Sequence, residues 1–319
     1  MNILITGASG FIGQHLIQAL LKDRKEPRQR IIATDCQSPP YSLLIPFYRV
    51  DLTNARSTEK IIRKIQPRQI YHLAGFSSAA RSFQEPARAI LQNLTITANV
   101  LQAVLRMGAP CRILLMSTVQ VYGDARGKIC EQTKTAPLSP YAMSKLAMEE
   151  LARLYFRNFG LDIIIVRATN QIGPGQSDQY VTAGFARQIV EMKMGIRPLE
   201  MEVGNLQVKR DFLDVRDAVQ AYLLLMRKAE SGEIYNLASG KNILVAKLLH
   251  KMLLLSRLDP GKIKISVSRA RFRPEPKTDQ SISIAKIQKL GFKPKISLQK
   301  TLKDLTDSLM ETFPKAKIL

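Results

Sequence analysis

The sequence is poor in the residues on which metal centres, disulfide scaffolds and membrane spans depend. Of its 319 residues only three are cysteine and three are histidine, and none is tryptophan. Neither the cysteines nor the histidines have metal-site spacing, so we expect no metal site, no disulfides and reduced thiols in a cytoplasmic protein. No apolar run approaches the roughly 20 residues that span a bilayer, and we expect no membrane partner. Met1 runs directly into an apolar, strand-like segment, which is not the pattern of a signal peptide.

Acidic residues are also scarce. The chain has 26 Asp and Glu against 48 Lys and Arg, a formal net charge of +22. Such a balance can indicate nucleic-acid binding. The basic residues are scattered, however, without interleaved aromatics or an unbroken cluster. We therefore favour a basic surface that attracts an anionic small substrate over specific nucleic-acid binding, because such a field would steer a diphosphate-bearing ligand toward the protein.

The first half of the chain alternates short apolar runs with longer amphipathic segments. This alternation predicts an α/β fold with a doubly wound parallel sheet, covered by helices on both faces. After about residue 170 the alternation loosens, and helices are expected at 179–195, 214–229, 245–258 and 298–312. The strands expected in the first half are 2–6, 31–35, 47–51, 69–74, 112–117 and 162–168, and the helices are 11–23, 54–65, 86–107 and 141–158.

A glycine-rich segment joins the first expected strand to the first helix. It reads Thr6-Gly7-Ala8-Ser9-Gly10-Phe11-Ile12-Gly13. Glycines here allow a tight turn and let a pyrophosphate approach the backbone at a helix N-terminus. Asp35 ends the second strand, where its carboxylate could accept hydrogen bonds from both hydroxyls of an unmodified ribose. Because Cys36-Gln37 supplies no arginine for a 2′-phosphate, we favour NAD(H) as cofactor, with NADP(H) possible. The plainer alternatives are a simple turn and a solvated Asp35.

Tyr141 and Lys145 form a candidate reaction centre. They lie four residues apart at the start of an expected helix, so both side chains are on one helical face. A free phenol has a pKa of about 10, and a nearby ammonium lowers it toward the working pH. Ser117-Thr118 ends a strand at the sheet edge where open α/β sheets bind ligands. The Thr118 hydroxyl could there bind a substrate oxygen, or it could merely cap the strand.

The G-x-x-G-x-x-G spacing together with the Tyr-x-x-x-Lys motif resembles the extended short-chain dehydrogenase/reductase family, also called the NAD-dependent epimerase/dehydratase family. The resemblance implies that Thr118, Tyr141 and Lys145 are catalytic. It also implies a homodimer through the helices at 86–107 and 141–158. The further cofactor contacts that it implies are Asp51, Leu52, Ala74, Gly75 and Asn93.

Gln120 separates two chemistries within this family. Nucleotide-sugar 4,6-dehydratases carry an acidic residue two positions after the catalytic hydroxyl, and this residue removes a proton and helps to expel the C6 hydroxyl. The chain has Gln120 at that position, and an amide cannot act as acid or base. Dehydration is therefore disfavoured, whereas hydride transfer at a carbinol carbon needs only Thr118, Tyr141 and Lys145.

The second half most resembles GDP-4-dehydro-6-deoxy-D-mannose reductases, which reduce the C4 ketone of their substrate to give GDP-D-rhamnose. The resemblance rests on 170–176, 204–217 and the Pro-Leu-Ser-Pro-Tyr of 137–141. It implies that Arg210 and Arg273 contact the diphosphate of a GDP-linked sugar, a role that suits a bidentate guanidinium. Asn170 is implied to face the substrate. The chain departs from the pattern at Arg167-Ala168, where Arg-Pro is expected, at Glu275-Pro276 and at Gln120.

We therefore expect a dinucleotide-binding Rossmann domain with the catalytic residues at 1–168. A smaller α/β substrate-binding domain is expected at 169–319, with some of its elements returning to the first. The function expected is reduction of the C4 ketone of a nucleotide-linked 4-keto-6-deoxyhexose. A nucleotide-sugar 4-epimerase that retains NAD is the nearest alternative, because it uses the same three residues. A non-catalytic nucleotide- or RNA-binding Rossmann protein is a third possibility, which Thr118, Tyr141 and Lys145 argue against.

Overall fold

A computed structural model describes residues 1–23, 29–39, 44–268 and 280–313 of the chain. The chain divides into two compact units. The first unit comprises Met1–Thr169, Val219–Leu237 and Glu275–Phe292, and the second comprises Asn170–Ala218, Ala238–Pro274 and Lys293–Leu319. Arg273 lies outside the described residues. Among those described, no helix is both long enough and apolar enough to cross a membrane, and no group of His, Cys, Asp or Glu is arranged to hold a metal ion.

The first unit is built on a seven-stranded sheet in the order β11-β7-β5-β4-β1-β2-β3. All six strand pairs are parallel, which confirms the parallel α/β prediction. The third and fourth strands are shorter than predicted, and β11 was not predicted. The strands are β1 (Asn2–Thr6), β2 (Arg30–Asp35), β3 (Phe47–Arg49), β4 (Gln69–His72), β5 (Arg112–Thr118), β7 (Asp162–Ala168) and β11 (Ile234–Leu237).

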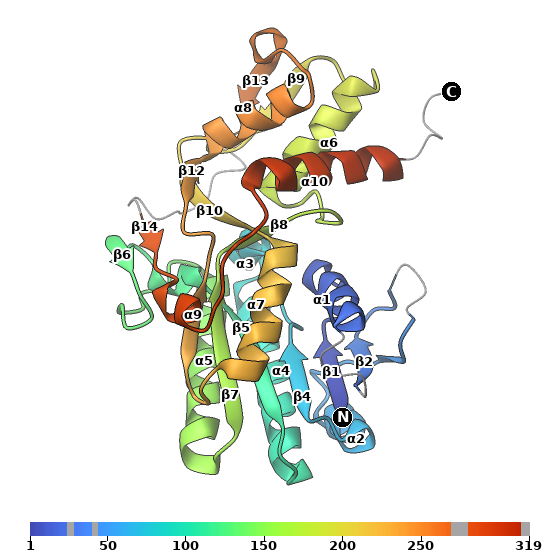
Figure 1. The fold of residues 1–319 in the computed structure, drawn as a ribbon, viewed down its shortest axis with the longest axis vertical. Helices are drawn as coiled ribbons and strands as arrows, with labels where there is room; N and C mark the ends of the chain where they lie inside the picture. Colours follow the sequence, from blue (N-terminus) through green and yellow to red (C-terminus); the bar gives the residue numbers. More distant parts are fainter. Residues whose placement is uncertain (24–28, 40–43, 269–279, 314–319) are drawn as a thin grey trace. The chain divides into compact units, whose positions relative to one another are not determined.

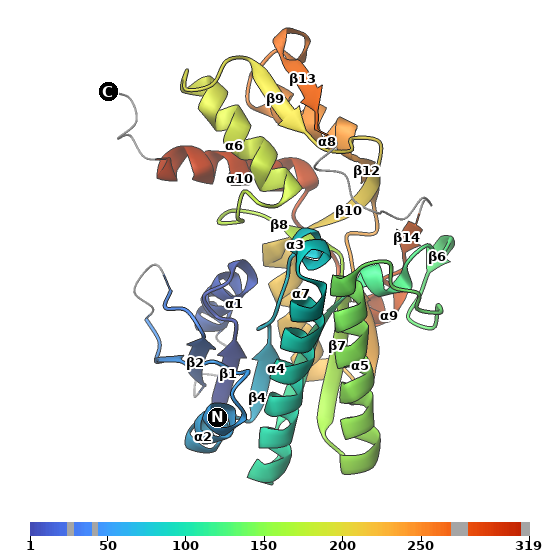
Figure 2. The same ribbon diagram turned by 180° about the vertical axis from the view of Figure 1, so that it is seen from behind.

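Helices cover both faces of this sheet, as Figures 1 and 2 show from opposite sides. One face carries α1 (Phe11–Lys22) and α7 (Val215–Lys228), and the other carries α2 (Ala55–Ile65), α4 (Pro86–Met107) and α5 (Pro140–Phe159). Ile and Leu side chains of β1, β4, β5 and β7 pack against α2, α4 and α5 in one buried cluster. Burial on both faces explains why these strands are continuous apolar runs. The unit also contains α3 (Ala79–Gln84), η1 (Val119–Tyr122), β6 (Gly127–Ile129), β14 (Gln280–Ile282) and α9 (Ala285–Lys289).

Local sequence sets the bounds of α5, the helix that carries the candidate reaction centre. The Ser139 hydroxyl accepts a hydrogen bond from the backbone N–H of Ala142 at 3.1 Å, and Pro140 occupies the first turn, where its missing N–H has no helical partner. Gly160 ends the helix in the left-handed conformation at φ 67°. Tyr141 is therefore held in the first turn of a helix whose start is fixed by its own cap.

In the described part of the second unit, small sheets and helices surround a core of their own. Strand β10 (Lys209–Asp214) pairs in parallel with β8 (Asn170–Ile172) and antiparallel with β12 (Asn242–Leu244). Strand β13 (Lys264–Val267) pairs in parallel with β9 (Glu200–Val203). Apolar residues of α6 (Val181–Lys193), α8 (Val245–Leu255) and α10 (Leu298–Thr312) form the buried cluster. The unit also includes the 3-10 turn η2 (Pro260–Lys262).

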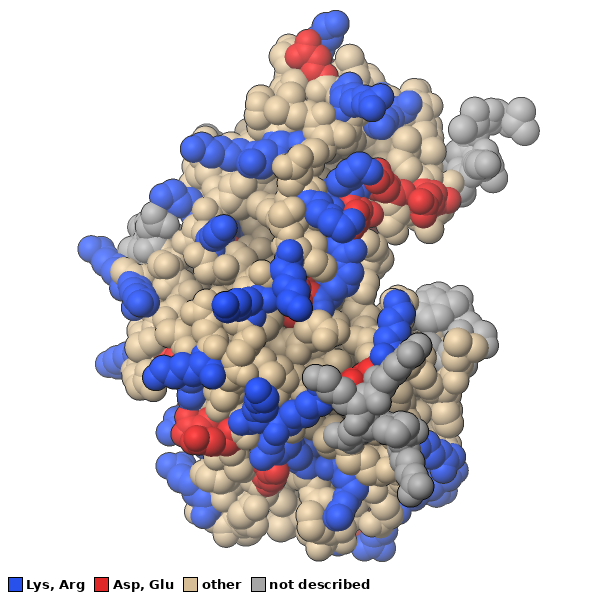
Figure 3. Space-filling model, viewed as in Figure 1, with Lys and Arg blue, Asp and Glu red and all other residues tan. Residues whose placement is uncertain are grey.

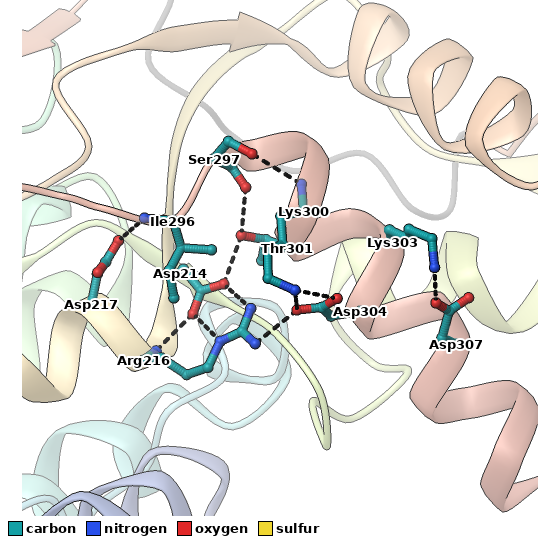
Figure 4. Close-up of polar contacts among 10 residues, drawn as sticks. All are labelled: Asp214, Arg216, Asp217, Ile296, Ser297, Lys300, Thr301, Lys303, Asp304 and Asp307. Carbon is teal, nitrogen blue, oxygen red and sulfur yellow. Dashed lines mark hydrogen bonds and ion pairs between the residues drawn. The ribbon is translucent and has the colours of Figure 1, made fainter.

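A buried carboxylate anchors the N-terminus of α10 within the second unit (Figure 4). Asp214 is 3% exposed, and its Oδ2 accepts hydrogen bonds from Thr301 Oγ1 and Arg216 Nη2, both at 2.7 Å. The guanidinium of Arg216 also reaches Asp304 at 2.7 Å. Asp217 accepts hydrogen bonds from two successive backbone N–H groups just before the helix, those of residues 295 and 296. These contacts give the acidic residues of the 204–217 segment a structural use.

Candidate active site

The glycine-rich turn after β1 is closed by backbone contacts that no larger residue would allow. Gly7 has φ 69°, and a Cβ there would lie 2.7 Å from the backbone nitrogen of Ala74. A Cβ on Gly13 would lie 2.6 Å from the carbonyl oxygen of Ala8. The N–H of Gly10 donates to the carbonyl of Gly7 at 3.2 Å, and α1 begins at Phe11. The first N–H groups of a helix have no partner within it, so this turn suits the diphosphate of a dinucleotide.

Asp35 is tied to the glycine-rich turn. Its Oδ2 accepts a hydrogen bond from the backbone N–H of Ser9 at 3.0 Å, and its Oδ1 accepts one from the N–H of Gln37 at 3.3 Å. The carboxylate is thus oriented by the loop beside it. Each oxygen has a further lone pair, so Asp35 can still accept bonds from a ribose.

Asp51 and Leu52 follow β3 and have different surroundings. Asp51 is exposed, and its Oδ1 accepts hydrogen bonds from the N–H of Thr53 at 2.9 Å and from its hydroxyl at 2.7 Å. Leu52 is buried in the core of the first unit. These contacts explain the local turn, whereas the contacts with an adenine implied by the family resemblance stay predictions.

Asn93, a fully buried residue of α4, holds the loop after β4. Its Oδ1 accepts a hydrogen bond from the N–H of Phe76 at 2.6 Å, and its Nδ2 donates to the Phe76 carbonyl at 3.1 Å and to Ser144 Oγ at 2.8 Å. Gly75 has φ 147°, and a Cβ on it would meet the Asn93 side chain. Asn93 therefore joins the Ala74-Gly75 loop to the residue that precedes Lys145 in α5.

Lys145 connects α5 to the end of β5. Its Nζ donates to the carbonyl of Met116 at 2.9 Å, and the residue is only 6% exposed. Burial lowers the pKa of its ammonium to about 8, although the charge of Glu149 opposes this fall. Thr118 lies two residues beyond the carbonyl that Lys145 holds. The structure thus brings Lys145 and the strand end bearing Thr118 to one place.

Thr118 and Tyr141 occupy the two elements that Lys145 joins. Thr118 is 5% exposed, and its Oγ1 accepts a hydrogen bond from the N–H of Gln120 at 3.3 Å, which caps η1. This is the capping alternative considered from the sequence, but the hydroxyl hydrogen is still available to a substrate oxygen. Tyr141 is half-buried in the first turn of α5, and Gln120 is exposed. Helix α5 packs against both β5 and η1.

A buried ion pair behind Lys145 was missed in the sequence. Glu149 and Arg167 are 0% and 3% exposed at their side chains, and Arg167 Nη2 lies 2.6 Å from Glu149 Oε2. Ser117, next to Thr118, donates its hydroxyl to Glu149. The pair therefore links β5, α5 and β7 beneath the reaction centre. The spacing of Glu149, four residues after Lys145, could have indicated that it shares a helix face with Lys145 and Tyr141.

His72 is a second buried polar residue that the sequence did not single out. Its Nδ1 lies 2.8 Å from Thr6 Oγ1, and its Nε2 lies 3.4 Å from Thr97 Oγ1. Burial, with a smaller contribution from the charge of Lys145, lowers the pKa of His72 to about 3. The neutral ring thus ties β1, just before the glycine-rich turn, to β4 and α4. Thr6 Oγ1 also accepts the N–H of Ala74 at 3.2 Å.

The candidate substrate residues of the second unit lie on one small sheet. Arg210, in β10, is half-buried, and its Nη1 donates to the carbonyl of Lys209 at 2.9 Å. Asn170, in β8, donates from Nδ2 to the carbonyl of Asp211 at 2.9 Å. The structure thus places Asn170 beside the residue that follows Arg210. Arg273 lies outside the described residues, so its predicted diphosphate contact is not located.

Basic side chains are distributed over the visible face of both units. Figure 3 shows Lys and Arg dispersed over this face, with fewer and smaller patches of Asp and Glu. Many of the described acidic residues are engaged by basic ones, as in the pairs Arg63–Glu59 and Lys264–Glu200. The excess of Lys and Arg therefore produces a broad positive field.

The chain matches the family model described as GDP-mannose 4,6 dehydratase over residues 4–305. It is 35% identical to the GDP-6-deoxy-D-mannose reductase of Pseudomonas aeruginosa over 95% of both chains. It is 30% identical to the dTDP-glucose 4,6-dehydratase of Haemophilus influenzae over 95% of this chain and 96% of that one.

Solved structures agree with this assignment. The structure of RMD from Pseudomonas aeruginosa complexed with NADPH matches with a TM-score of 0.84 and 30% identity, over 97% of this chain and 99% of that one. The UDP-glucose 4-epimerase of Thermotoga maritima with UDP-glucose matches with a TM-score of 0.88 and 25% identity, over 98% and 100%. The glycine-rich turn, the parallel sheet and the full-length matches agree, and the chain belongs to the GDP-mannose 4,6 dehydratase family, with nucleotide-sugar reductases, epimerases and dehydratases among its relatives.

Proposed function

We propose that the protein reduces the C4 ketone of a nucleotide-linked 4-keto-6-deoxyhexose at the expense of NAD(P)H, with GDP-4-dehydro-6-deoxy-D-mannose as substrate and GDP-D-rhamnose as product. The observation that carries the proposal is the bond from Lys145 Nζ to the carbonyl of Met116 at 2.9 Å. This bond brings the Tyr141 helix to the strand that ends at Thr118. The 35% identity to a GDP-6-deoxy-D-mannose reductase supports the substrate class.

The glycine-rich turn suits the cofactor. A Cβ on Gly7 or Gly13 would clash with backbone atoms, so only glycine allows this tight turn at the start of α1, where a pyrophosphate can approach the backbone. Gly7, Gly10 and Gly13 would hold the pyrophosphate and Asp35 the ribose. A bound reduced nicotinamide supplies the hydride, with its two electrons, that adds to the C4 carbonyl carbon. The residues of the chain position the substrate and supply the proton.

Tyr141 gives its phenolic proton to the C4 oxygen as the carbonyl becomes an alcohol. The Thr118 hydroxyl donates a hydrogen bond to the same oxygen while it accepts the N–H of Gln120, so the two bonds strengthen each other. Lys145, held as an ammonium near neutral pH, stabilises the phenolate that remains. In the second unit, Arg210 binds the diphosphate of the sugar nucleotide through its guanidinium, Asn170 contacts the sugar, and Arg273 makes a second diphosphate contact.

The identity of Gln120 supports reduction over dehydration. Gln120 lies two residues after Thr118 and is exposed. Its backbone N–H donates a hydrogen bond to the Thr118 hydroxyl. A side-chain amide does not titrate near neutral pH, so it cannot act as the acid or base that assists loss of the C6 hydroxyl. The substrate must therefore arrive already dehydrated, as a 4-keto-6-deoxy sugar.

Incubation of the protein with GDP-4-keto-6-deoxymannose and NADH or NADPH tests the proposal. We expect one reduced nicotinamide to be consumed for each product, followed by its absorbance, with the C4 configuration of the product determined by nuclear magnetic resonance. Interconversion of C4 epimers without net consumption of nicotinamide would instead identify an epimerase. Nucleotide binding without turnover, together with RNA affinity that falls steeply with salt, would identify a binding protein.

We further propose that the protein is a homodimer, formed through α4 and α5 as the family resemblance implies. The two helices pack on each other and carry exposed apolar side chains, among them Leu91 (63% exposed) on α4 and Leu154 (41% exposed) on α5. Burial of such side chains in a second copy would remove them from water. Sedimentation should give twice the mass of the chain, and Leu91→Glu should shift the protein to the mass of one chain; wild-type protein that sediments as one chain would refute the dimer.

A further inference from the structure

The register of the sheet places an arginine beside Asp35. Strands β2 and β3 pair in parallel with Asp35 opposite Arg49. Residues that face each other in this way project from the same side of the sheet. On β3 the neighbouring side chains, Tyr48 and Val50, pack against the core shared with α2 and α4. Arg49 therefore projects to the other face, which carries α1 and the glycine-rich turn.

The guanidinium of Arg49 lies at the end of β2. Its Nε donates to the carbonyl of Cys36 at 3.1 Å, and the residue is exposed. Across residues 1–23, 29–39, 44–268 and 280–313, no ion pair joins Arg49 to a carboxylate. Its terminal nitrogens are thus held next to the residue that follows Asp35, in a position to meet an anion there.

Arg49 is also the nearest basic residue in the sequence on the C-terminal side of Asp35. Residues 36–48 contain no Lys or Arg, and neither does the glycine-rich segment from Thr6 to Gly13. The Asp35 carboxylate already accepts hydrogen bonds from two backbone N–H groups, those of Ser9 and Gln37. These N–H dipoles and the Arg49 charge offset the repulsion that an isolated carboxylate would exert on a phosphate.

We propose that Arg49 is a cofactor-specificity residue that binds the 2′-phosphate of NADPH, so that the protein uses NADPH as well as NADH. The proposal rests on the proposed function in one respect, that the glycine-rich turn binds a nicotinamide dinucleotide. Cys36 and Gln37, which follow Asp35 in the chain, supply no arginine, whereas the pairing of β2 with β3 places Arg49 opposite Asp35. A guanidinium suits a phosphate because its N–H groups form paired, charge-assisted hydrogen bonds.

Binding measurements on the full-length protein and on Arg49→Gln test the proposal without turnover. The dissociation constants of NADPH and NADH are measured by titration calorimetry, and those of adenosine 2′,5′-bisphosphate and 5′-AMP by competition. We expect Arg49→Gln to weaken the two 2′-phosphorylated ligands by about tenfold to a hundredfold, the loss typical of a hydrogen bond to a charged group. NADH and 5′-AMP should change by less than about twofold.

Arg56→Gln serves as the matched control, because Arg56 is exposed on α2 and its loss changes the net charge equally. This variant should leave all four affinities unchanged. Equal losses for NADPH and NADH in Arg49→Gln, equal losses of NADPH affinity in both variants, or wild-type protein that binds NADH but not NADPH would each overturn the proposal. If NADPH binding depends on Arg49 but no ketone is reduced, the inference stands while the proposed function fails.

Discussion

The two units differ in how deeply their candidate site residues are buried and in what their buried polar residues bind. In the first unit four polar residues near the candidate reaction centre are almost completely buried, whereas Tyr141 is half-buried: Asn93 and Glu149 are 0% exposed, Thr118 5% and Lys145 6%. In the second unit the candidate substrate residues Arg210 and Asn170 are half-buried. Its buried acids instead hold the fold together, as Asp211 does by accepting hydrogen bonds from the backbone N–H groups of residues 239 and 241.

We interpret this difference as a division of roles, with the proposed chemical step in the first unit and the proposed substrate binding in the second. A group that must have a shifted pKa needs a dry environment, and burial provides it for Lys145. A group that binds a highly charged diphosphate needs access to water before the ligand arrives. We therefore expect substitutions in the first unit to reduce the rate or the stability, and substitutions of Arg210 to reduce affinity.

The largest effect should come from Tyr141→Phe, which removes the proposed proton donor. The rate constant kcat for ketone reduction should fall by about a thousandfold, within the range typical of a lost general acid. Tyr155→Phe is the matched control, because it removes from the same helix a hydroxyl that donates to Gln102 Oε1 at 2.9 Å. That variant should stay within about twofold of wild-type activity. Full activity in Tyr141→Phe would refute the mechanism.

Glu149→Gln should test how far the buried pair supports the first unit. Arg167 would keep its charge in the core without a carboxylate, so the free energy of unfolding should fall by about 3–5 kcal/mol. Urea denaturation followed by circular dichroism measures this loss. In the control Glu150→Gln, an exposed carboxylate paired with Arg153 is lost, and the change should be below about 1 kcal/mol. Equal losses of unfolding free energy in the two variants would show that the buried pair stabilises the first unit no more than the exposed pair does.

Much of the first unit could be predicted because its residues obey two short-range rules. Strands buried on both faces are apolar runs, and candidate site residues stand at the ends of such runs, as Thr118 does at the end of β5. Arg49 shows where this reasoning ends. Its neighbour in space is Asp35, fourteen residues earlier, and only the pairing of β2 with β3 brings them together. The local sequence around Asp35 or Arg49 does not indicate which residues of β2 and β3 pair with each other.

The second unit was harder to predict, for a physical reason. Several of its strands have only three or four residues, such as β8 and β12, and so few residues cannot show an alternating pattern. The helix expected at 214–229 is present as α7, most of which belongs to the first unit, and the helix expected at 298–312 is present as α10 in the second unit. Asp214, expected to open the first of these helices, instead closes β10 and binds Thr301, 87 residues later in the chain. Such a long-range contact has no local sequence signature.

Arg210→Ala should weaken substrate binding in the second unit without slowing the chemical step. We expect the KM for the sugar nucleotide to rise by about tenfold to a hundredfold, with kcat within about threefold of wild type, because a diphosphate contact is made equally before and during hydride transfer. Lys251→Gln, on the exposed face of α8, is the control for the loss of one positive charge. A fall in kcat with unchanged KM would place Arg210 in the chemistry and remove the distinction between the units.

The pH dependence of kcat should reflect the Lys145 ammonium. With a pKa of about 8, the ammonium is mostly present at pH 7 and mostly lost at pH 9, so kcat should fall about tenfold between them. Stability should change in the opposite direction. Since the folded pKa lies below the 10.5 of a free lysine, the folded state binds fewer protons than the unfolded state between pH 8 and 10.5, and the contribution of Lys145 to stability rises there.

Initial rates of ketone reduction at saturating substrate, measured from pH 7 to pH 9, test the catalytic part. Urea denaturation of wild type and of Lys145→Met from pH 7.5 to pH 10.5 tests the stability part, because the wild type should gain free energy of unfolding relative to Lys145→Met as the pH rises. A kcat that is flat from pH 7 to pH 9 would show that the ammonium is not needed for the reaction.

Thr301→Val should give the smallest effect and tests the anchor of α10 in the second unit. Valine has nearly the same shape as threonine but cannot donate to Asp214, which keeps its bonds to Arg216, so the loss should be about 1–2 kcal/mol. Amide hydrogen exchange along α10 measures it as a local free energy of opening. Thr306→Val is the control, because its hydroxyl donates to the Leu302 carbonyl one turn back, a contact that contributes little. If the two variants lose the same protection, Asp214 does not anchor the helix, and the buried acids of the second unit would need another explanation.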